Sequence, residues 1–148
     1  MTATPAPTGK PNITVNPYLY FGGRCEEAID FYKKALGAEV GFLMRFKEGP
    51  DQSMTPPGCG DKVLHARLEI GNTVVFVSDG CCDGKTDFQG FSLSINVPTE
   101  ADADRIFAAL AEGGKVDMPL SKTFFSPRFG MVDDRFGVAW LVIVDRSV

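Results

Sequence analysis

The 148-residue chain repeats one order of predicted elements in its two halves, and this repeat limits the folds that it can form. Each half predicts a strand, a helix and then three strands. The predicted helices align at one offset, because Phe107 lies 76 residues after Phe31 and Gly113 lies 76 residues after Gly37. Since either half is small for a stable unit, we expect a single domain over residues 13–148, in which two modules share one sheet.

In the first half, residues 13–21 alternate apolar and polar side chains with the period of a strand. Glu26 and Glu27 suit a helix N-terminus, and apolar residues at three- and four-residue spacings behind them predict a helix that ends at Gly37. A Gly/Pro-rich segment at 47–62 predicts a long mobile loop, of a length that often covers a site. The other strands of this half are predicted at residues 39–46, 63–70 and 73–79.

The second half predicts a strand at 91–97 and a helix at 99–112 that stops at two glycines. Three further strands are predicted near Val116, Phe125 and Trp140. We therefore expect modules at 13–87 and 90–146. Residues 1–12 hold three prolines and no periodicity, and they predict a flexible leader.

Charge excludes several classes of partner, and the N-terminal residues indicate the compartment and the state of the thiols. The formal net charge of −4 offers no excess positive potential for phosphates, so neither nucleic acid nor an acidic membrane surface is expected. No apolar run approaches the roughly 18 residues that span a bilayer. The N-terminal residues carry no signal-peptide pattern, which predicts a cytoplasmic protein with reduced thiols and no disulfide framework. The four cysteines are Cys25, Cys59, Cys81 and Cys82.

Several short motifs accompany the repeat. The segments Ala28-Ile29-Asp30-Phe31-Tyr32, Leu36-Gly37-Ala38 and Asp134-Arg135-Phe136-Gly137-Val138-Ala139-Trp140 resemble the vicinal oxygen chelate superfamily. This superfamily includes glyoxalase I, extradiol dioxygenases, fosfomycin-resistance enzymes and bleomycin-binding proteins. Four further segments resemble its PhnB-like branch, which is often labelled 3-demethylubiquinone-9 3-methyltransferase: Asn16-Pro17-Tyr18-Leu19, His65-Ala66, Val77-Ser78-Asp79 and Gly90-Phe91-Ser92-Leu93.

The resemblance covers residues 13–144 and implies an α+β fold. In that fold two βαβββ modules form an open, cup-shaped, mixed sheet of eight strands. Most members are homodimers that complete the cavity, so we expect a homodimer with a small-molecule ligand.

Members with metal chemistry take His, Glu or Gln ligands from the first and last strands of each module. The resemblance implies that these positions fall at Asn16, Phe76, Ser92 and Leu141. An amide, a hydroxyl and two hydrocarbon side chains are poor ligands for a divalent ion. We therefore predict neither a metal nor another cofactor.

His65 and Asp79 are the candidate catalytic residues. His65 is the only histidine of the chain, and on its predicted strand it could act as a general base, contact a ligand or make a structural hydrogen bond. Asp79 ends the fourth strand, where its carboxylate could orient His65 or accept a bond from a substrate hydroxyl. Asp79-Gly80 could equally form a turn.

The candidate ligand-binding residues are aromatic, hydroxyl or cationic side chains that could line a cup. Core packing is the alternative for the aromatic residues, and a solvated surface is the alternative for the arginine. The set comprises Tyr18, Tyr20, Ser78, Ser92, Phe125, Arg128 and Trp140, and the same reasoning extends to Phe42, Phe88 and Phe124.

The sequence leaves several functions open. The first is binding of a small organic molecule in a dimeric cup without metal chemistry. The second is a metal-independent lyase or isomerase that uses His65 as its acid or base. A dimer with a vestigial cup is a further reading. The methyl transfer named in the branch label would need a nucleotide-sized cofactor site, and the sequence has no Gly-rich phosphate cradle for one.

Overall fold

The computed structural model describes residues 11–145. Residues 1–10, which hold most of the predicted leader, and residues 146–148 lie outside the described part. The first module comprises β1 (Tyr18–Tyr20), α1 (Cys25–Leu36), β2 (Glu39–Arg45), the 3₁₀ helices η1 (Phe46–Glu48) and η2 (Gln52–Met54), β3 (Val63–Ile70) and β4 (Thr73–Ser78). The second comprises β5 (Leu93–Val97), α2 (Glu100–Ala111), β6 (Lys115–Ser121), β7 (Phe129–Asp133) and β8 (Ala139–Val144). The predicted α+β fold of two βαβββ modules is confirmed.

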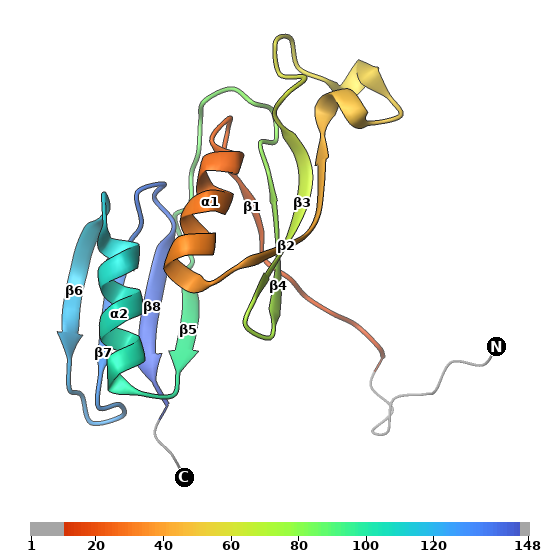
Figure 1. Ribbon diagram of the computed structural model, residues 1–148. Helices are drawn as coiled ribbons and strands as arrows, with labels where there is room; N and C mark the ends of the chain where they lie inside the picture. Colours follow the sequence, from red (N-terminus) through yellow and green to blue (C-terminus); the bar gives the residue numbers. More distant parts are fainter. Residues whose placement is uncertain (1–10, 146–148) are drawn as a thin grey trace.

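The eight strands form two mixed sheets of four (Figure 1). Their orders are β1-β4-β3-β2 and β5-β8-β7-β6, so the two modules have the same topology. In each sheet the first strand pairs in parallel with the last, and the other pairs are antiparallel. Within the described residues of one chain no ladder joins the two sheets, and β1 and β5 are both edge strands.

Two predicted strands differ from the observed ones. The first is shorter than residues 13–21, because only Tyr18–Tyr20 pair with β4, and Val15 is 90% exposed. The strand predicted near Phe125 begins only at Phe129, since Thr123 and Ser126 close a turn by exchanging backbone and side-chain hydrogen bonds. Neither helix of the described part is long and apolar enough to cross a membrane.

One face of α1 packs on the first sheet. Its buried residues are Cys25, Ala28, Ile29, Phe31, Tyr32 and Ala35. The helix ends as predicted at Gly37, whose φ of 68° is left-handed and costs glycine little. Its N-terminus has no side-chain cap from Arg24. Asp79, from the end of β4, supplies the carboxylate that caps it.

A buried junction of aromatic rings around one carboxylate joins the two modules. Phe136, in the β7–β8 turn, packs edge-on against Phe21 and Phe31 with ring centroids 5.7 Å apart in both pairs. Asp134 accepts the Tyr32 hydroxyl, the Trp140 indole N–H and the backbone N–H groups of residues 136 and 138. Because Tyr32 lies on α1 and the other donors lie in the second module, Asp134 holds the modules together.

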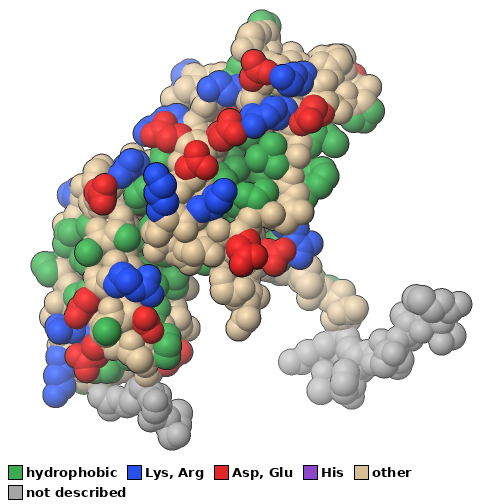
Figure 2. All heavy atoms as spheres, viewed as in Figure 1, with side chains coloured by type: hydrophobic (Ala, Val, Ile, Leu, Met, Phe, Trp, Pro, Cys, Tyr) green, Lys and Arg blue, Asp and Glu red, His purple; other side chains and the backbone are tan. Residues whose placement is uncertain are grey.

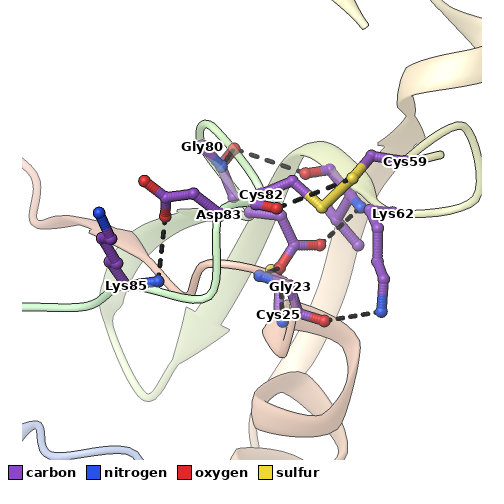
Figure 3. The surroundings of a disulfide bond; sticks show 11 residues. Gly23, Cys25, Cys59, Lys62, Gly80, Cys82, Asp83 and Lys85 are labelled. Atoms are coloured by element: carbon purple, nitrogen blue, oxygen red, sulfur yellow. Dashed lines mark hydrogen bonds between the residues drawn. A yellow bond between two sulfur atoms is a disulfide. The ribbon is translucent and has the colours of Figure 1, made fainter. Parts of the chain in front are cut away.

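The prediction of four reduced cysteines is wrong in this structure, because Cys59 and Cys82 form a disulfide (Figure 3). The physical reason is the β3–β4 hairpin. The Asp79 N–H donates to the Val63 carbonyl over 2.9 Å, so the segments that flank these two residues lie side by side. Their cysteines, 23 residues apart in sequence, thereby have Cα atoms 6.7 Å apart. Cys25 is buried and free, and Cys81 is exposed and free.

Candidate functional site

Aromatic side chains gather on the face of the first sheet that points away from α1. Successive side chains of a strand point to opposite faces, and the helix side takes buried residues such as Leu19, Ala66 and Val77. On the other face Tyr18 pairs with Phe76 across β1–β4, and Phe76 pairs with Arg67 across β4–β3. We call this set the aromatic face, and it consists of Tyr18, Tyr20, Phe42, His65 and Phe76.

The rings of the aromatic face contact one another but stay open to solvent. Tyr18 stacks on Tyr20 with ring centroids 4.9 Å apart and lies 5.5 Å from the His65 ring, which in turn stacks on Phe76 at 5.2 Å. Phe42 lies 6.1 Å from His65. Tyr18, Tyr20 and Phe42 are 38%, 55% and 48% exposed. Exposed apolar clusters are common at binding surfaces, and the aromatic face is therefore the candidate site.

A direct hydrogen bond joins two predicted site residues. The Tyr18 hydroxyl lies 2.7 Å from Nδ1 of His65. The pKa of Tyr18 is raised above its ordinary value, mainly because the side chain is partly buried and to a smaller extent because Tyr20 lies beside it. The hydroxyl therefore stays protonated, and it donates to Nδ1 in the tautomer of His65 that carries its proton on Nε2.

The structure does not bring Asp79 to His65. The Asp79 side chain is 1% exposed, and its Oδ1 accepts the backbone N–H groups of Gly23 and Cys25 over 2.7 and 2.8 Å. Its Oδ2 accepts the Val63 N–H over 2.8 Å. The carboxylate thus fills the positive N-terminal end of α1 and has a structural role.

Ser78 also has a structural role. It pairs with Tyr20 across β1–β4 and is 3% exposed. Its hydroxyl accepts the Gly80 N–H over 2.9 Å and points to the Val63 carbonyl at 3.5 Å. These contacts close the turn after β4.

The remaining predicted ligand contacts lie on the second module. Trp140 is buried, and its indole N–H donates to Asp134. Arg128 lies beside the acidic start of α2, with its Nε 3.4 Å from a Glu100 oxygen and 3.5 Å from an Asp104 oxygen. Phe125 is exposed and packs edge-on against Phe129 at 5.1 Å. None of these three side chains contacts the aromatic face.

Ser92 lines a groove between the modules. The groove has a volume of about 690 Å³ and runs along the edge strand β5. Hydroxyl and amide side chains from both modules face it alongside apolar ones. The polar lining residues are Asn72, Thr73, Ser92, Ser94 and Asn96. Only Ser92 of these was anticipated from the sequence.

Sequence reasoning did not assign a ligand-binding role to Phe76, which it placed only at a metal-ligand position. The signal that could have identified it is the strand alternation of 73–79, which puts Phe76 on the face opposite the buried Val75 and Val77.

The residues at the implied metal positions do not fit a divalent ion. The Asn16 amide nitrogen donates to the Val74 carbonyl over 2.9 Å, and Phe76 and Leu141 carry no donor atoms. Among residues 11–145 no group of three or more His, Cys, Asp or Glu side chains is arranged to hold a metal. The donor set here is one neutral amide and one hydroxyl, which bind such ions weakly.

Comparison with known proteins supports the resemblance seen in the sequence. The chain is 33% identical over 143 residues to protein YjdN of Escherichia coli, and the alignment covers 91% of this chain and 97% of YjdN. Protein PA1353 of Pseudomonas aeruginosa is 39% identical, with a TM-score of 0.78 over 92% of this chain and 100% of that protein. The PhnB protein of Bacillus cereus is 28% identical, with a TM-score of 0.76 over 89% of this chain and 99% of that protein.

The fold extends to a wider group. A glyoxylase/bleomycin resistance protein/dioxygenase domain from Frankia sp. has a TM-score of 0.59 at 19% identity over 89% of this chain and 94% of that domain, which shows a shared fold. The model of the family described as 3-demethylubiquinone-9 3-methyltransferase matches residues 13–143. The chain therefore belongs to this family, the PhnB-like branch of the vicinal oxygen chelate superfamily.

Proposed function

We propose that this protein binds a small organic molecule with a planar or apolar ring on the aromatic face, in a cup that a second copy of the chain completes. The observation that carries the proposal is the cluster of five contacting rings, of which three are more than a third exposed. Rings of this size contribute large contact areas to a ligand, and the Tyr18 hydroxyl and His65 supply a few polar groups that orient it.

The open edges support the second copy. In the described part of one chain, β1 and β5 are edge strands whose outer sides pair with no other strand. Unpaired strand edges favour association with another chain. The groove of about 690 Å³ lies along β5 and borders the start of the first module at Pro17. A second chain that pairs with these edges would join sheets of four strands into the eight-stranded cup.

The charge of the surface favours a small ligand over nucleic acid. Acidic and basic side chains are interspersed on the face shown in Figure 2. Ion pairs join Arg45 to Glu26 and Arg24 to Glu27, each at 2.7 Å. Together with the formal charge of −4, this mixture gives the face in Figure 2 no basic stripe for phosphates.

Methyl transfer is not part of the proposal. A nucleotide cofactor is commonly held by a glycine-rich turn and the free N–H groups of a helix N-terminus. Gly22 and Gly23 precede α1 here, but the Gly23 and Cys25 N–H groups already bind the Asp79 carboxylate. The protein thus fills this anion site with its own side chain.

Native mass spectrometry tests the proposal directly. The untagged full-length protein is expected to give a dimer that carries the excess mass of a small organic molecule and binds 8-anilinonaphthalene-1-sulfonate as an aromatic probe. A Tyr18→Ala/Phe76→Ala variant should bind the probe at least about tenfold more weakly, because it loses two stacking surfaces. Phe125→Ala removes an exposed ring elsewhere and is the matched control. A monomer, or probe binding unchanged in the double variant, would contradict the proposal.

A second function is favoured by the hydrogen bond between Tyr18 and His65. A histidine held in one tautomer by a tyrosine can move a proton during a metal-independent lyase or isomerase reaction. Since His65 is the only histidine, its imidazole nitrogen signals are unambiguous in ¹⁵N NMR spectra of the untagged chain. We expect the Nε2–H tautomer in the native protein and a mixture of tautomers in Tyr18→Phe.

Turnover distinguishes this second function from simple binding. For any substrate found, His65→Gln should lower kcat by about a hundredfold or more without unfolding the protein. Tyr18→Phe should change the pH profile of kcat, because it removes the group that selects the tautomer. Full turnover in both variants would exclude the acid–base role and leave the binding proposal intact.

A further inference from the structure

The disulfide between Cys59 and Cys82 joins two segments that are otherwise separate. Cys59 lies in the connection from β2 to β3, and Cys82 lies four residues after β4 (Figure 3). We propose that this pair is a reversible thiol–disulfide exchange site, with low-molecular-weight thiols as its co-substrate. In its oxidised form it holds residues 48–61 against the end of the first sheet. This inference does not depend on the nature of the ligand.

The hydrogen bonds of residues 48–61 show why the disulfide matters. Among the described residues they run within the segment or to residues 45–47 and 62, as in the bond from the Lys47 N–H to the Gly60 carbonyl. The one covalent link beyond them is the disulfide from Cys59 to Cys82. The segment is therefore attached at its base, and the disulfide is its single link to the turn after β4.

The rest of the module does not need the disulfide. Asp79 binds the N–H groups of Gly23, Cys25 and Val63 through its carboxylate, and its own N–H binds the Val63 carbonyl. These bonds hold α1, β3 and β4 together next to the cysteines. Reduction is therefore a local event that releases residues 48–61 and leaves the sheet in place.

The backbone at Cys82 is a second, independent observation. Among residues 11–145, Cys82 is the one residue other than glycine with a positive φ, at 55°. A side chain in the left-handed region is strained and persists where the surrounding structure imposes it. Such outliers cluster at reactive and switching sites. Relaxation of this residue favours opening of the turn once the sulfurs separate.

The four cysteines differ in accessibility in a way that suits exchange. Cys59 is 8% exposed, whereas Cys82 is only partly buried and its neighbour Cys81 is exposed. An incoming thiolate therefore reaches the Cys82 sulfur first. Cys25 takes no part, because burial and the nearby Asp79 and Glu26 carboxylates raise the pKa of its thiol far above the ordinary range.

The exchange balances with two thiol molecules. A thiolate RS⁻ attacks the Cys82 sulfur, the bond between the two cysteine sulfurs breaks, and Cys59 leaves as a thiolate that takes a proton from water. A second thiolate attacks the sulfur of R in the mixed disulfide and releases Cys82, which is also protonated. Two RSH are oxidised to RSSR, and the protein gains two electrons and two protons. The reverse sequence with RSSR restores the disulfide.

Redox titration of the full-length protein tests the proposal. The protein is equilibrated with mixtures of reduced and oxidised glutathione, quenched with acid, alkylated and analysed by peptide mass spectrometry. We expect a Cys59–Cys82 cross-link that forms and breaks reversibly. Hydrogen exchange in residues 48–61 should be about tenfold faster in the reduced protein, with no change in residues 93–144. Cys59→Ser should show the fast exchange in every mixture, whereas Cys81→Ser, the matched control, should behave as the native chain.

Four outcomes would overturn the inference. In the first, Cys59 and Cys82 are both alkylated even in fully oxidised glutathione. In the second, Cys59 cross-links to Cys81 and the Cys81→Ser variant forms no disulfide. In the third, the predicted disulfide forms but residues 48–61 exchange at equal rates in both redox states. If reduction unfolds the whole module, faster exchange would extend through α1 and β3, and the local release would be refuted.

Discussion

Replacement of Asp134 by alanine is expected to lower the free energy of unfolding by about 3–5 kcal/mol. The carboxylate is 3% exposed and accepts four hydrogen bonds, from the Tyr32 hydroxyl, the Trp140 indole and the backbone N–H groups of Phe136 and Val138. Alanine leaves all four donors buried without an acceptor. Because Tyr32 lies 102 residues away on the other module, the loss falls on the junction of the modules. Urea unfolding followed by circular dichroism measures it.

A second variant separates the charge from the hydrogen bonds. In Asp134→Asn the amide oxygen can still accept two N–H groups, but the amide nitrogen is a donor and faces the Trp140 N–H. We expect a smaller loss than in Asp134→Ala. Asp30→Asn, at an exposed carboxylate on α1, is the control and should change the unfolding free energy by less than about 0.5 kcal/mol. Equal stability of Asp134→Ala and Asp30→Asn would refute a structural role for Asp134.

Replacement of Asp79 by alanine is expected to cost about 3 kcal/mol of unfolding free energy. It removes the cap of α1 and leaves the N–H groups of Gly23, Cys25 and Val63 without their acceptor. The loss should concentrate in the first module, where hydrogen exchange of the first turn of α1 should rise most. Thermal unfolding and hydrogen exchange followed by mass spectrometry provide the two measurements.

A second Asp79 variant tests whether this carboxylate is structural or catalytic. Asp79→Asn should leave the imidazole signals of His65 unchanged, because the two side chains make no contact. Asp83→Asn, in the neighbouring exposed turn, is the matched control and should preserve stability. A shift of the His65 signals in Asp79→Asn that Asp83→Asn does not produce would restore the pairing that the sequence suggested.

The candidate site shows how far strand alternation can predict a surface. The period of two in residues 63–70 predicts that His65 and Arg67 share one face of their strand, and in the structure both lie on the face that carries the aromatic residues. Which face of the sheet is open to solvent depends on the face that α1 covers. The sequence of one strand does not say which face that is. Tyr18 and His65 are 47 residues apart, so their hydrogen bond follows from the order β1-β4-β3.

The roles of buried polar residues do not follow from the sequence alone. The sequence offers Asp79 as a catalytic candidate and Ser78 as a ligand-binding candidate, but their hydrogen bonds go to backbone groups. Trp140 is a ligand-binding candidate in the sequence, but in the structure its indole N–H donates to Asp134. A polar side chain in a core must find a partner, and the identity of the partner is a property of the tertiary structure.

The sequence by itself determined the repeat, the order of the elements, the end of α1 at Gly37 and the family. These features depend on local periodicity, turn chemistry and short motifs, which act over a few residues. Only the tertiary structure decided that Asp79 caps α1, that Asp134 joins the modules and that Cys59 meets Cys82. These contacts join residues that are between 23 and 102 positions apart, and their proximity results from packing the whole chain.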